Sequence, residues 1–266
     1  MEINRSNINE LVNKCDVRPD KDYGQNFLID PIIASHITDL LELNQNDHVL
    51  EIGPGLGSLT HFMFDKCNLE VCDIDFRMIN FLKIFYKEDI SYILDDVRKI
   101  DVSKYDKIIG NLPYNITTEL VTFLLMNSNA KKMVLMCQSE AFNRFFDLSG
   151  ENYGPVSILL HLLGKSKKEL TVKPGSFYPA PKCNSLVFTF EYAPLTDKET
   201  AINVYKLAKS LFLNRRKTIL NNLKNYNKDA QKDEAILKEL NIEPTRRPEN
   251  ISPESYLKMY QLLLSK

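Results

Sequence analysis

The sequence contains no apolar run that approaches the ~18–20 residues needed to cross a bilayer, so we expect a soluble protein without a membrane partner. Its first 24 residues lack an apolar core and include several acids, which argues against a secretory signal or transit peptide there. The five cysteines form no CxxC pair, and the histidines number only four. We therefore expect a cytoplasmic protein with no metal site.

The chain also lacks an excess of either charge, because 34 Lys and Arg nearly balance 35 Asp and Glu and the formal net charge is −1. That value alone argues against a nucleic-acid partner, but the distribution is uneven. From Thr196 onward, 14 Lys and Arg outnumber 9 Asp and Glu. The densest basic stretches predict phosphate contacts at Arg215, Arg216, Arg246 and Arg247. A solvated helical face would explain the same charges equally well.

Between residues 48 and 140 short β-type runs alternate with stretches of helical length and apolar spacing. The expected strands are 48–53, 69–75, 90–94, 106–111 and 132–138, and the expected helices are 58–66, 76–87 and 115–127. Strands of near-continuous apolar character that alternate with helices indicate a parallel sheet covered on both faces. The predicted fold class is α/β, with a Rossmann-like, mostly parallel sheet.

The rest of the chain suggests the end of this sheet and a second domain. A helix at about 154–163 is followed by strand-like runs at 167–172 and 185–192, which we expect to form a terminal hairpin. Helical patterns then cover 198–213, 215–225, 229–240 and 252–264. We predict a catalytic domain over residues 1–194 and a small all-helical domain over 195–266.

A glycine-rich loop, "EIGPGLGSLT", follows the first predicted strand. Gly53 and Gly55 let the backbone turn tightly and approach a ligand where a Cβ would collide. In an open parallel sheet ligands bind beyond the carboxyl ends of the strands, which is where this loop should lie. The loop alone is also typical of dinucleotide sites, so it is not specific.

Two acids follow the next two strands. Asp73 suits the two hydroxyls of a ribose, with Asp75 as a nearby alternative, and Asp96 suits the exocyclic amine of an adenine. A helix cap or a turn residue is the alternative interpretation of Asp96. Together the loop and the acids predict a nucleoside cofactor, either NAD or S-adenosylmethionine.

The loop after the fourth strand distinguishes between these two candidate cofactors. Asn111, Leu112, Pro113 and Tyr114 place an amide and an aromatic ring directly behind a buried strand, and Pro113 cannot continue that strand. The Asn oxygen and an adjacent carbonyl can hold the two N–H groups of an exocyclic amine, and Tyr114 can stack on the base. This pattern predicts N-methylation of a base amine, although a purely structural Pro-Tyr loop remains the alternative.

These motifs resemble those of the ribosomal RNA adenine-N6 dimethyltransferases from Gly24 to about Tyr260. The resemblance rests on "GQNFL" (24–28), "EIGPGLGSLT" (51–60), "NLPYNIT" (111–117), "YGPVSILL" (153–160), "SFYPAPKCNS" (176–185), "LFLNRRKTILNNL" (211–223) and "RRPENIS" (246–252). It implies a Rossmann-like methyltransferase domain and S-adenosylmethionine as cofactor. The cofactor-contacting positions it implies are Gln25, Asn26, Leu28, Gly53, Gly55, Asp73, Asp96 and Asn111. It also implies that Phe177 and Tyr114 form a stacking clamp around the target base.

Two branches of that family compete. One methylates two adjacent adenosines near the 3′ end of small-subunit rRNA during ribosome assembly, and the other methylates a large-subunit adenosine and confers macrolide resistance. The "GPG" loop, Leu112, "NRRKT" and "RRPENIS" resemble the first branch. We therefore expect an immature small ribosomal subunit as the partner and a monomeric enzyme.

The sequence departs from the family pattern before Gly24, where "RPDKDY" stands in place of a basic stretch. It also has Asp73 where Glu is more usual. Two hypotheses from other classes remain open. An oxidoreductase would need an acid–base residue for hydride transfer, for which the sequence offers no candidate. A non-catalytic assembly factor would not need the cofactor acids, which are present.

Overall fold

The computed structural model describes residues 2–14, 17–20 and 24–265, and it divides into two compact units. One unit comprises Met1–Ala141 and Lys167–Tyr192, and the other comprises Phe142–Ser166 and Ala193–Lys266. Residues 142–166 thus group with the C-terminal helices, although we assigned them to the first domain. Helix α6 (Pro155–Leu163) explains this, because it is buried over nearly its whole surface and contacts helices of the second unit. The functional assignment of 1–194 to catalysis and of 195–266 to RNA binding stays a prediction.

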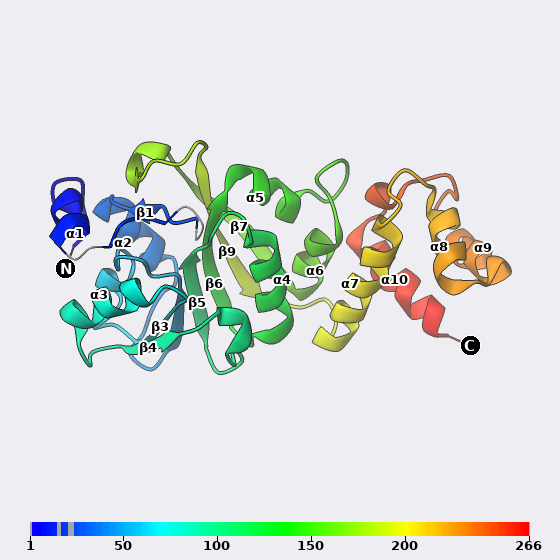
Figure 1. Ribbon diagram of the computed structural model, residues 1–266. Helices are drawn as coiled ribbons and strands as arrows, with labels where there is room; N and C mark the ends of the chain where they lie inside the picture. The colour runs from blue at the N-terminus through cyan, green and yellow to red at the C-terminus, as the bar shows by residue number, and fades with distance from the viewer. Residues whose placement is uncertain (1, 15–16, 21–23, 266) are drawn as a thin grey trace. The chain divides into compact units, whose positions relative to one another are not determined.

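The first unit is built on a seven-stranded sheet with the order β4-β3-β2-β5-β6-β9-β7 (Figure 1). Its strands are β2 (His48–Ile52), β3 (Asn68–Asp73), β4 (Ser91–Leu94), β5 (Lys107–Asn111), β6 (Lys132–Gln138), β7 (Gly164–Val172) and β9 (Ser185–Tyr192). Strands β2 to β6 pair in parallel, and β9 runs antiparallel to β6. The expected parallel sheet with two final strands at its end is confirmed.

The strand order reverses between β2 and β5. From β2 the chain moves outward to β3 and β4, and then returns to pair β5 with the other side of β2, with Ile52 opposite Gly110. A crevice opens at such a switch point beyond the carboxyl ends of the strands. The loop after β2 and the loop after β5 therefore become neighbours, although 58 residues separate Gly53 from Asn111.

Helices α2 and α3 pack against one face of this sheet. The inward residues Val49, Ile109 and Val134 share a buried core with residues of both helices. Aspartates start each helix: Asp30 caps α2 and Asp75 caps α3, each accepting a hydrogen bond from the first turn. The helices that lie wholly in this unit are α1 (Ile8–Lys14), α2 (Pro31–Asp39), α3 (Phe76–Tyr86) and α4 (Thr117–Asn127). Helix α5 (Ser139–Phe146) begins in it.

The helix expected over 58–66 is wrong, because only the short 3-10 helix η1 (Thr60–Phe62) forms there. Two hydroxyls are used elsewhere. Ser58 Oγ donates to the Leu28 carbonyl at 2.5 Å, and Thr60 Oγ1 donates to Glu51 Oε2 at 2.6 Å. Both bonds tie this stretch to residues outside it. The chain is consequently held as a compact loop between β2 and β3.

A two-stranded pairing was not expected from the sequence. Strand β1 (Phe27–Leu28) pairs antiparallel with β8 (Phe177–Tyr178), with Phe27 opposite Tyr178. The run 24–28 is thereby fixed beside the loop that contains Phe177. Because each strand has only two residues, no alternation of apolar residues could have revealed it.

The second unit is helical. Besides α6 it contains α7 (Lys198–Phe212), α8 (Ile219–Asn227), α9 (Ala230–Glu239), the 3-10 helix η4 (Pro248–Asn250) and α10 (Pro253–Leu264). Helix α8 begins later than the expected residue 215, because the Thr218 side chain caps it by accepting from Asn221 N–H. Tyr153 and Tyr256 are fully buried and donate to the carbonyls of Ile251 and Pro248. None of the helices in the described ranges is long and apolar enough to span a membrane.

Candidate active site

A cavity of about 730 Å³ lies at the carboxyl ends of β2, β3 and β5 and opens to solvent. Its walls come from four stretches that are distant in the sequence: 24–28, 51–59, 73–74 and 111–114. Three of the four features that the sequence predicted to converge here, the glycine loop, Asp73 and the Asn111 loop, therefore do so.

The glycine loop forms one wall. Gly53 and Gly55 have φ of 63° and 55°, a left-handed backbone that side chains disfavour. A Cβ on Gly55 would come within 2.9 Å of the Phe27 ring. The loop thus depends on glycine both for its turn and for its contact with β1, and it keeps its backbone accessible to a ligand in the cavity.

Asp73 ends β3 and lines the same cavity. Its Oδ1 accepts from Asp75 N–H at 2.9 Å. Burial raises the pKa of Asp73 to about 6, and the negative charge of Asp75 adds to the rise, while N–H groups of the loop oppose it. A carboxylate held this way can still accept from two hydroxyl groups, as the predicted ribose contact requires.

Glu51 is a cavity residue that the sequence reading missed. It is 1% exposed and accepts the 2.6 Å bond from Thr60. Burial raises the pKa of Glu51 to about 7, although the bonds from Thr60 favour the ionised form. A charged residue inside the otherwise apolar run "VLEIG" was the available signal, because such a residue is rarely buried without a reason.

A hydrogen bond to the Asn26 backbone fixes the orientation of the Asn111 side chain. Its Nδ2 donates to the Asn26 carbonyl at 3.0 Å. Because a carbonyl only accepts, the nitrogen must face Asn26, and Oδ1 becomes the atom that remains for a ligand. Among the described residues no hydrogen bond to Oδ1 is formed. The predicted acceptor is therefore preset in this arrangement.

The next two residues supply a second acceptor. Leu112 N–H donates to the Met136 carbonyl at 3.0 Å, which fixes the chain where it leaves β5. The Pro113 carbonyl already accepts from Ile116 N–H and from the Thr117 hydroxyl, at 3.3 and 2.9 Å. The Leu112 carbonyl, by contrast, accepts no hydrogen bond from the described part of the chain. It is therefore the carbonyl next to Asn111 that can accept one from an amine.

Tyr114 is half-buried at the cavity wall. Its hydroxyl bonds Ser185 Oγ at 2.6 Å, and Ser185 is fully buried on β9. Burial raises the pKa of Tyr114 to about 12. The phenol is therefore neutral at physiological pH and anchors the ring, which leaves stacking rather than acid–base chemistry as its use.

Asp96 does not line the cavity. It caps the 3-10 helix η2 (Val97–Lys99) by accepting from Arg98 N–H at 3.0 Å, and it is paired with the Arg98 guanidinium. The bonds from Arg98 lower the pKa of Asp96, so it is ionised. This geometry corresponds to the capping alternative raised by the sequence. The adenine contact of Asp96 stays a prediction.

Phe177 is also absent from the cavity wall, with 3% of its side chain exposed. It belongs to β8 and is part of the core shared with β1. Its role as the second half of a clamp with Tyr114 stays a prediction. A ring in this packing can reach a base only if the neighbouring side chains move.

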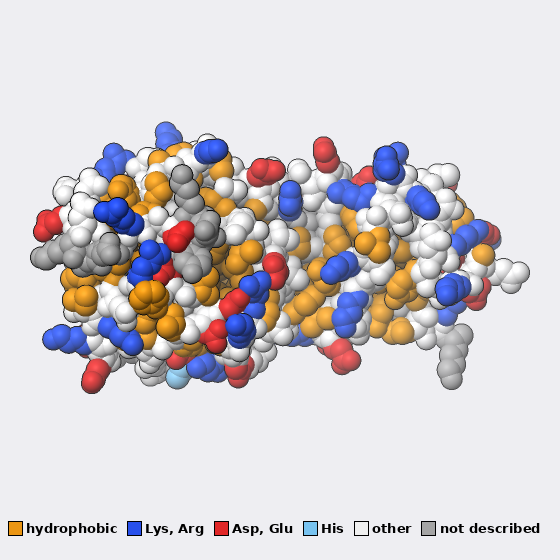
Figure 2. Space-filling model, viewed as in Figure 1, with side chains coloured by type: hydrophobic (Ala, Val, Ile, Leu, Met, Phe, Trp, Pro, Cys, Tyr) orange, Lys and Arg blue, Asp and Glu red, His pale blue; other side chains and the backbone are white. Residues whose placement is uncertain are grey.

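The four candidate arginines differ in their surroundings. Arg215 donates to the carbonyls of Gly150 and Tyr153 at 3.1 and 3.3 Å, and it lies over the Phe212 ring. These contacts give Arg215 a structural explanation. Arg216, Arg246 and Arg247 are exposed. Figure 2 shows Lys and Arg side chains spread over the second unit with hydrophobic side chains between them. The RNA contacts stay predictions.

The residues of the cavity fit the cofactor that the sequence predicts. The cavity, at the switch point of a Rossmann-like sheet, offers two glycines with positive φ, a half-buried carboxylate at the end of the adjacent strand and an amide oxygen without a protein donor among the described residues. These are the features that the predicted nucleoside cofactor of a methyltransferase would need. Among the described residues no group of three His, Cys, Asp or Glu could hold a metal ion.

Comparison with known proteins identifies the family. The model of the ribosomal RNA adenine dimethylase family matches residues 16–264. The chain belongs to this family, which confirms the predicted class of S-adenosylmethionine-dependent rRNA adenine dimethyltransferase.

Curated relatives share most of the length. The ribosomal RNA small subunit methyltransferase A of Malacoplasma penetrans is 40% identical over 243 residues, 89% of each chain. The protein of the same name from Geobacter metallireducens is 32% identical over 269 residues, 94% of this chain and 97% of its own.

Solved structures agree on the fold. A dimethyladenosine transferase from Plasmodium falciparum has a TM-score of 0.75 and 25% identity, covering 88% of this chain and 95% of its own. The 23S rRNA methyltransferase ErmE has a TM-score of 0.71 at 22% identity, covering 90% of this chain and 100% of its own, and shows the fold alone. The predicted Rossmann-like sheet with C-terminal helices is confirmed.

Proposed function

We propose that this protein transfers methyl groups from S-adenosylmethionine to N6 of two adjacent adenosines near the 3′ end of small-subunit rRNA. The observation that carries the proposal is the pair of acceptors at Asn111 Oδ1 and the Leu112 carbonyl, beside the ring of Tyr114. Two acceptors next to a stacking surface match a planar amine on a base. The names of the relatives at 32–40% identity support the small subunit as substrate.

The chain's own residues orient the amine. Oδ1 of Asn111 and the Leu112 carbonyl each accept a hydrogen bond from one N–H of the amine. These bonds favour a tetrahedral nitrogen, whose lone pair is then no longer conjugated with the ring. A bound cofactor would supply an electrophilic methyl group; the N–C bond would form as the S–C bond breaks, S-adenosylhomocysteine would leave, and the amine would lose one proton for each methyl group gained. Tyr114 holds the base after it leaves its stack, a step that costs a few kcal/mol. Because both acceptors are fixed by bonds to Asn26 and Met136, little reorganisation is needed during transfer.

Asp73 and the glycine loop account for binding of the donor. The Asp73 carboxylate accepts from ribose hydroxyls, and Gly53 and Gly55 bring backbone close to the donor. To accept a hydrogen bond from the adenine amine, Asp96 would have to use a carboxylate that already accepts bonds from Arg98. Its contact is therefore the weaker part of this assignment.

The large-subunit alternative is less well supported. The only large-subunit methyltransferase among the proteins compared above shares the fold at 22% identity. We further propose that the enzyme acts as a cytoplasmic monomer on an immature small subunit, with the exposed Arg216, Arg246 and Arg247 contacting phosphates.

The test is methyl transfer with labelled S-adenosylmethionine to immature small subunits, mature small subunits and large subunits in parallel. We expect label only in the first, at two adjacent adenosines near the 3′ end after mapping. Label confined to a large-subunit adenosine would instead support the large-subunit branch of the family.

A further inference from the structure

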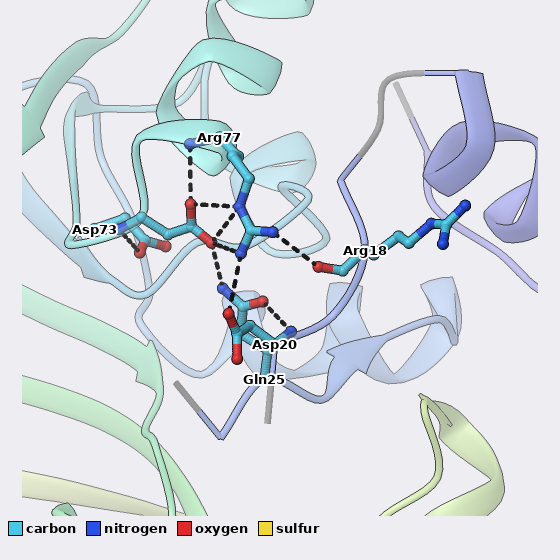
Figure 3. Close-up of polar contacts among 6 residues, drawn as sticks. Arg18, Asp20, Gln25, Asp73 and Arg77 are labelled. Atoms are coloured by element: carbon cyan, nitrogen blue, oxygen red, sulfur yellow. Dashed lines mark hydrogen bonds and ion pairs between the residues drawn. The ribbon is translucent and has the colours of Figure 1, made fainter. Parts of the chain in front are cut away.

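Arg77, in the first turn of α3, links that helix to the N-terminal run that borders the cavity (Figure 3). Its guanidinium bonds the Asp75 carboxylate through Nε at 2.9 Å and Nη2 at 2.6 Å. The same group reaches the Arg18 carbonyl at 3.5 Å and Asp20 Oδ2 at 3.7 Å. One side chain thus spans from a helix start to the segment that precedes Gly24.

Asp75 is the centre of these contacts. It is 2% exposed, caps α3 through Arg77 N–H, and accepts from Gln25 Nε2 at 2.9 Å. Burial alone would raise the pKa of Asp75, but the bonds from Arg77 and Gln25 hold it below its usual range. A buried carboxylate that stays ionised needs these donors, so removal of Arg77 would leave its charge poorly compensated.

Gln25 is held at both ends of its amide. Nε2 donates to Asp75, while Oε1 accepts from Asp20 N–H at 2.9 Å, and Gln25 N–H donates to the Asp20 carbonyl at 3.2 Å. The carboxylate only accepts and the Asp20 N–H only donates, so the amide has one orientation. Gln25 lines the cavity, yet its polar atoms are bonded to protein. The family resemblance implied that Gln25 contacts the cofactor, and this contact stays a prediction. Its hydrogen bonds show in addition that its side chain fixes the backbone.

The residues that follow Gln25 contact the catalytic loops directly. The Asn26 carbonyl accepts from Asn111 Nδ2 at 3.0 Å, and the Phe27 ring borders Gly55. The Leu28 carbonyl accepts from Ser58 Oγ at 2.5 Å. The position of the backbone at Asn26 therefore decides where the Asn111 amide lies, and Gln25 fixes that backbone from the N-terminal side.

We propose that Arg77 and Asp75 are positioning residues, which hold Gln25 and thereby set the 24–28 segment against the donor cavity and the Asn111 amide. The proposal rests on the proposed function for its rate measurement, but not for its binding measurement. It also gives Asp20, in the stretch that precedes Gly24, a structural partner, because its carboxylate lies 3.7 Å from the Arg77 guanidinium. The Asp20 contact is half-exposed and contributes little, so Asp75 is the main partner.

The deciding experiment measures S-adenosylmethionine affinity by calorimetry and single-turnover methyl transfer for Arg77→Ala, Arg77→Lys and Asp75→Asn. Lys104→Ala, which removes a surface ion pair to Glu70 in the first unit and lies outside the cavity, is the matched control. A misplacement of about 1 Å can cost ~100-fold in rate. We expect Arg77→Ala to bind the donor roughly tenfold more weakly and to transfer at least ~10-fold more slowly at saturating donor.

The conservative variants separate positioning from folding. Arg77→Lys keeps the charge without the two-pronged contact and should recover part of the affinity, whereas Asp75→Asn keeps an oxygen for the α3 cap and should lose affinity. The KM for RNA should not change in any variant. Wild-type donor affinity in a folded Arg77→Ala protein overturns the proposal. If the wild type methylates no small-subunit RNA, the proposed function fails while the calorimetric result still stands.

Discussion

The side-chain amide of Asn111 donates to the backbone carbonyl of Asn26 at 3.0 Å, across 85 positions of sequence. This bond occupies the Asn111 nitrogen and leaves its oxygen for a ligand, and it joins the loop proposed to hold the acceptor base to the segment that borders the donor cavity. Both halves of the proposed reaction meet at this contact.

Replacing Asn111 tests the proposed grip on the amine. Asn111→Ala removes an acceptor whose bonds matter most as the nitrogen becomes tetrahedral, so single-turnover transfer should slow by ~10²–10³-fold. RNA affinity should change little. Asn127→Ala, which removes an exposed amide on α4, should transfer at the wild-type rate. A wild-type rate for Asn111→Ala would make this loop structural.

Two substitutions of Tyr114 distinguish its ring from its hydroxyl. Tyr114→Phe keeps stacking but leaves the buried Ser185 hydroxyl without its partner, which should cost ~1 kcal/mol of unfolding free energy and little activity. Tyr114→Ala should weaken capture of the base by ~1–3 kcal/mol, seen as a higher KM for RNA. Adding Ser185→Ala to Tyr114→Phe should recover the lost stability. Equal KM values for the Phe and Ala variants would exclude stacking.

Donor binding should depend on pH through Asp73. Burial raises the pKa of Asp73 to about 6, and only the ionised carboxylate accepts from both ribose hydroxyls, so affinity should fall as pH drops below about 6. Asp73→Asn should bind roughly tenfold more weakly above that pH and flatten the profile. Asp65→Asn, at an exposed site, is the control. Calorimetry from pH 5 to 8 decides, and an unchanged profile in Asp73→Asn would remove the carboxylate from the donor site.

Asp96→Asn, measured alongside, tests the contact that the structure favours least. If Asp96 holds the adenine amine, donor affinity should fall by about tenfold. If it only caps η2 and pairs with Arg98, the thermal midpoint should shift and the affinity should not.

Glu51 should make the unliganded protein less stable as pH rises. Its folded pKa of about 7 exceeds the ordinary value of 4.5, so the folded state binds more protons and the free energy of unfolding decreases between about pH 4.5 and 7. The loss is on the order of 3 kcal/mol. Glu51→Gln keeps an acceptor for Thr60 and should melt higher than the wild type at pH 8, with the difference shrinking toward pH 5. Parallel stability curves from pH 5 to 8 would contradict this prediction.

The exposed and bonded arginines should behave differently. Arg216→Ala with Arg247→Ala should reduce the salt dependence of RNA binding, by about one unit of slope for each phosphate that is no longer neutralised, with little change in melting. Arg215→Ala should instead lower the melting temperature, because it removes bonds to Gly150 and Tyr153. Donor affinity should not change in either case. A slope that changes only with Arg215 would reverse these roles.

The strands and the cavity could be predicted because they depend on local signals. Apolar runs such as 133–137, with strand and helix patterns alternating around them, indicate a buried strand, and an Asn-Leu-Pro-Tyr loop behind a strand has few structural explanations. The 58–66 helix was mispredicted because its spacing is helical, while Ser58 and Thr60 bond to residues outside it. The packing of Phe177 against β1 depends on a contact across about 150 residues, which no local pattern encodes.

Glu51 and Gln25 illustrate two further limits. The charge of Glu51 is visible in the sequence, but its burial next to Thr60 is not. Gln25 was assigned by resemblance to the cofactor, and the structure adds the bonds to Asp75 and Asp20 that occupy its amide. Long-range hydrogen bonds of this kind need coordinates.

One edge of the seven-stranded sheet is formed by β7, whose outer side offers backbone groups to any strand that approaches. An unprotected edge of this length would recruit the same edge of another copy. Lys165, Lys167 and Lys168 are exposed along it. If two such edges met, the lysines of both copies would come close together, although Lys167 is partly compensated by Glu169, and their like charges would disfavour continuation of the sheet from one molecule into the next.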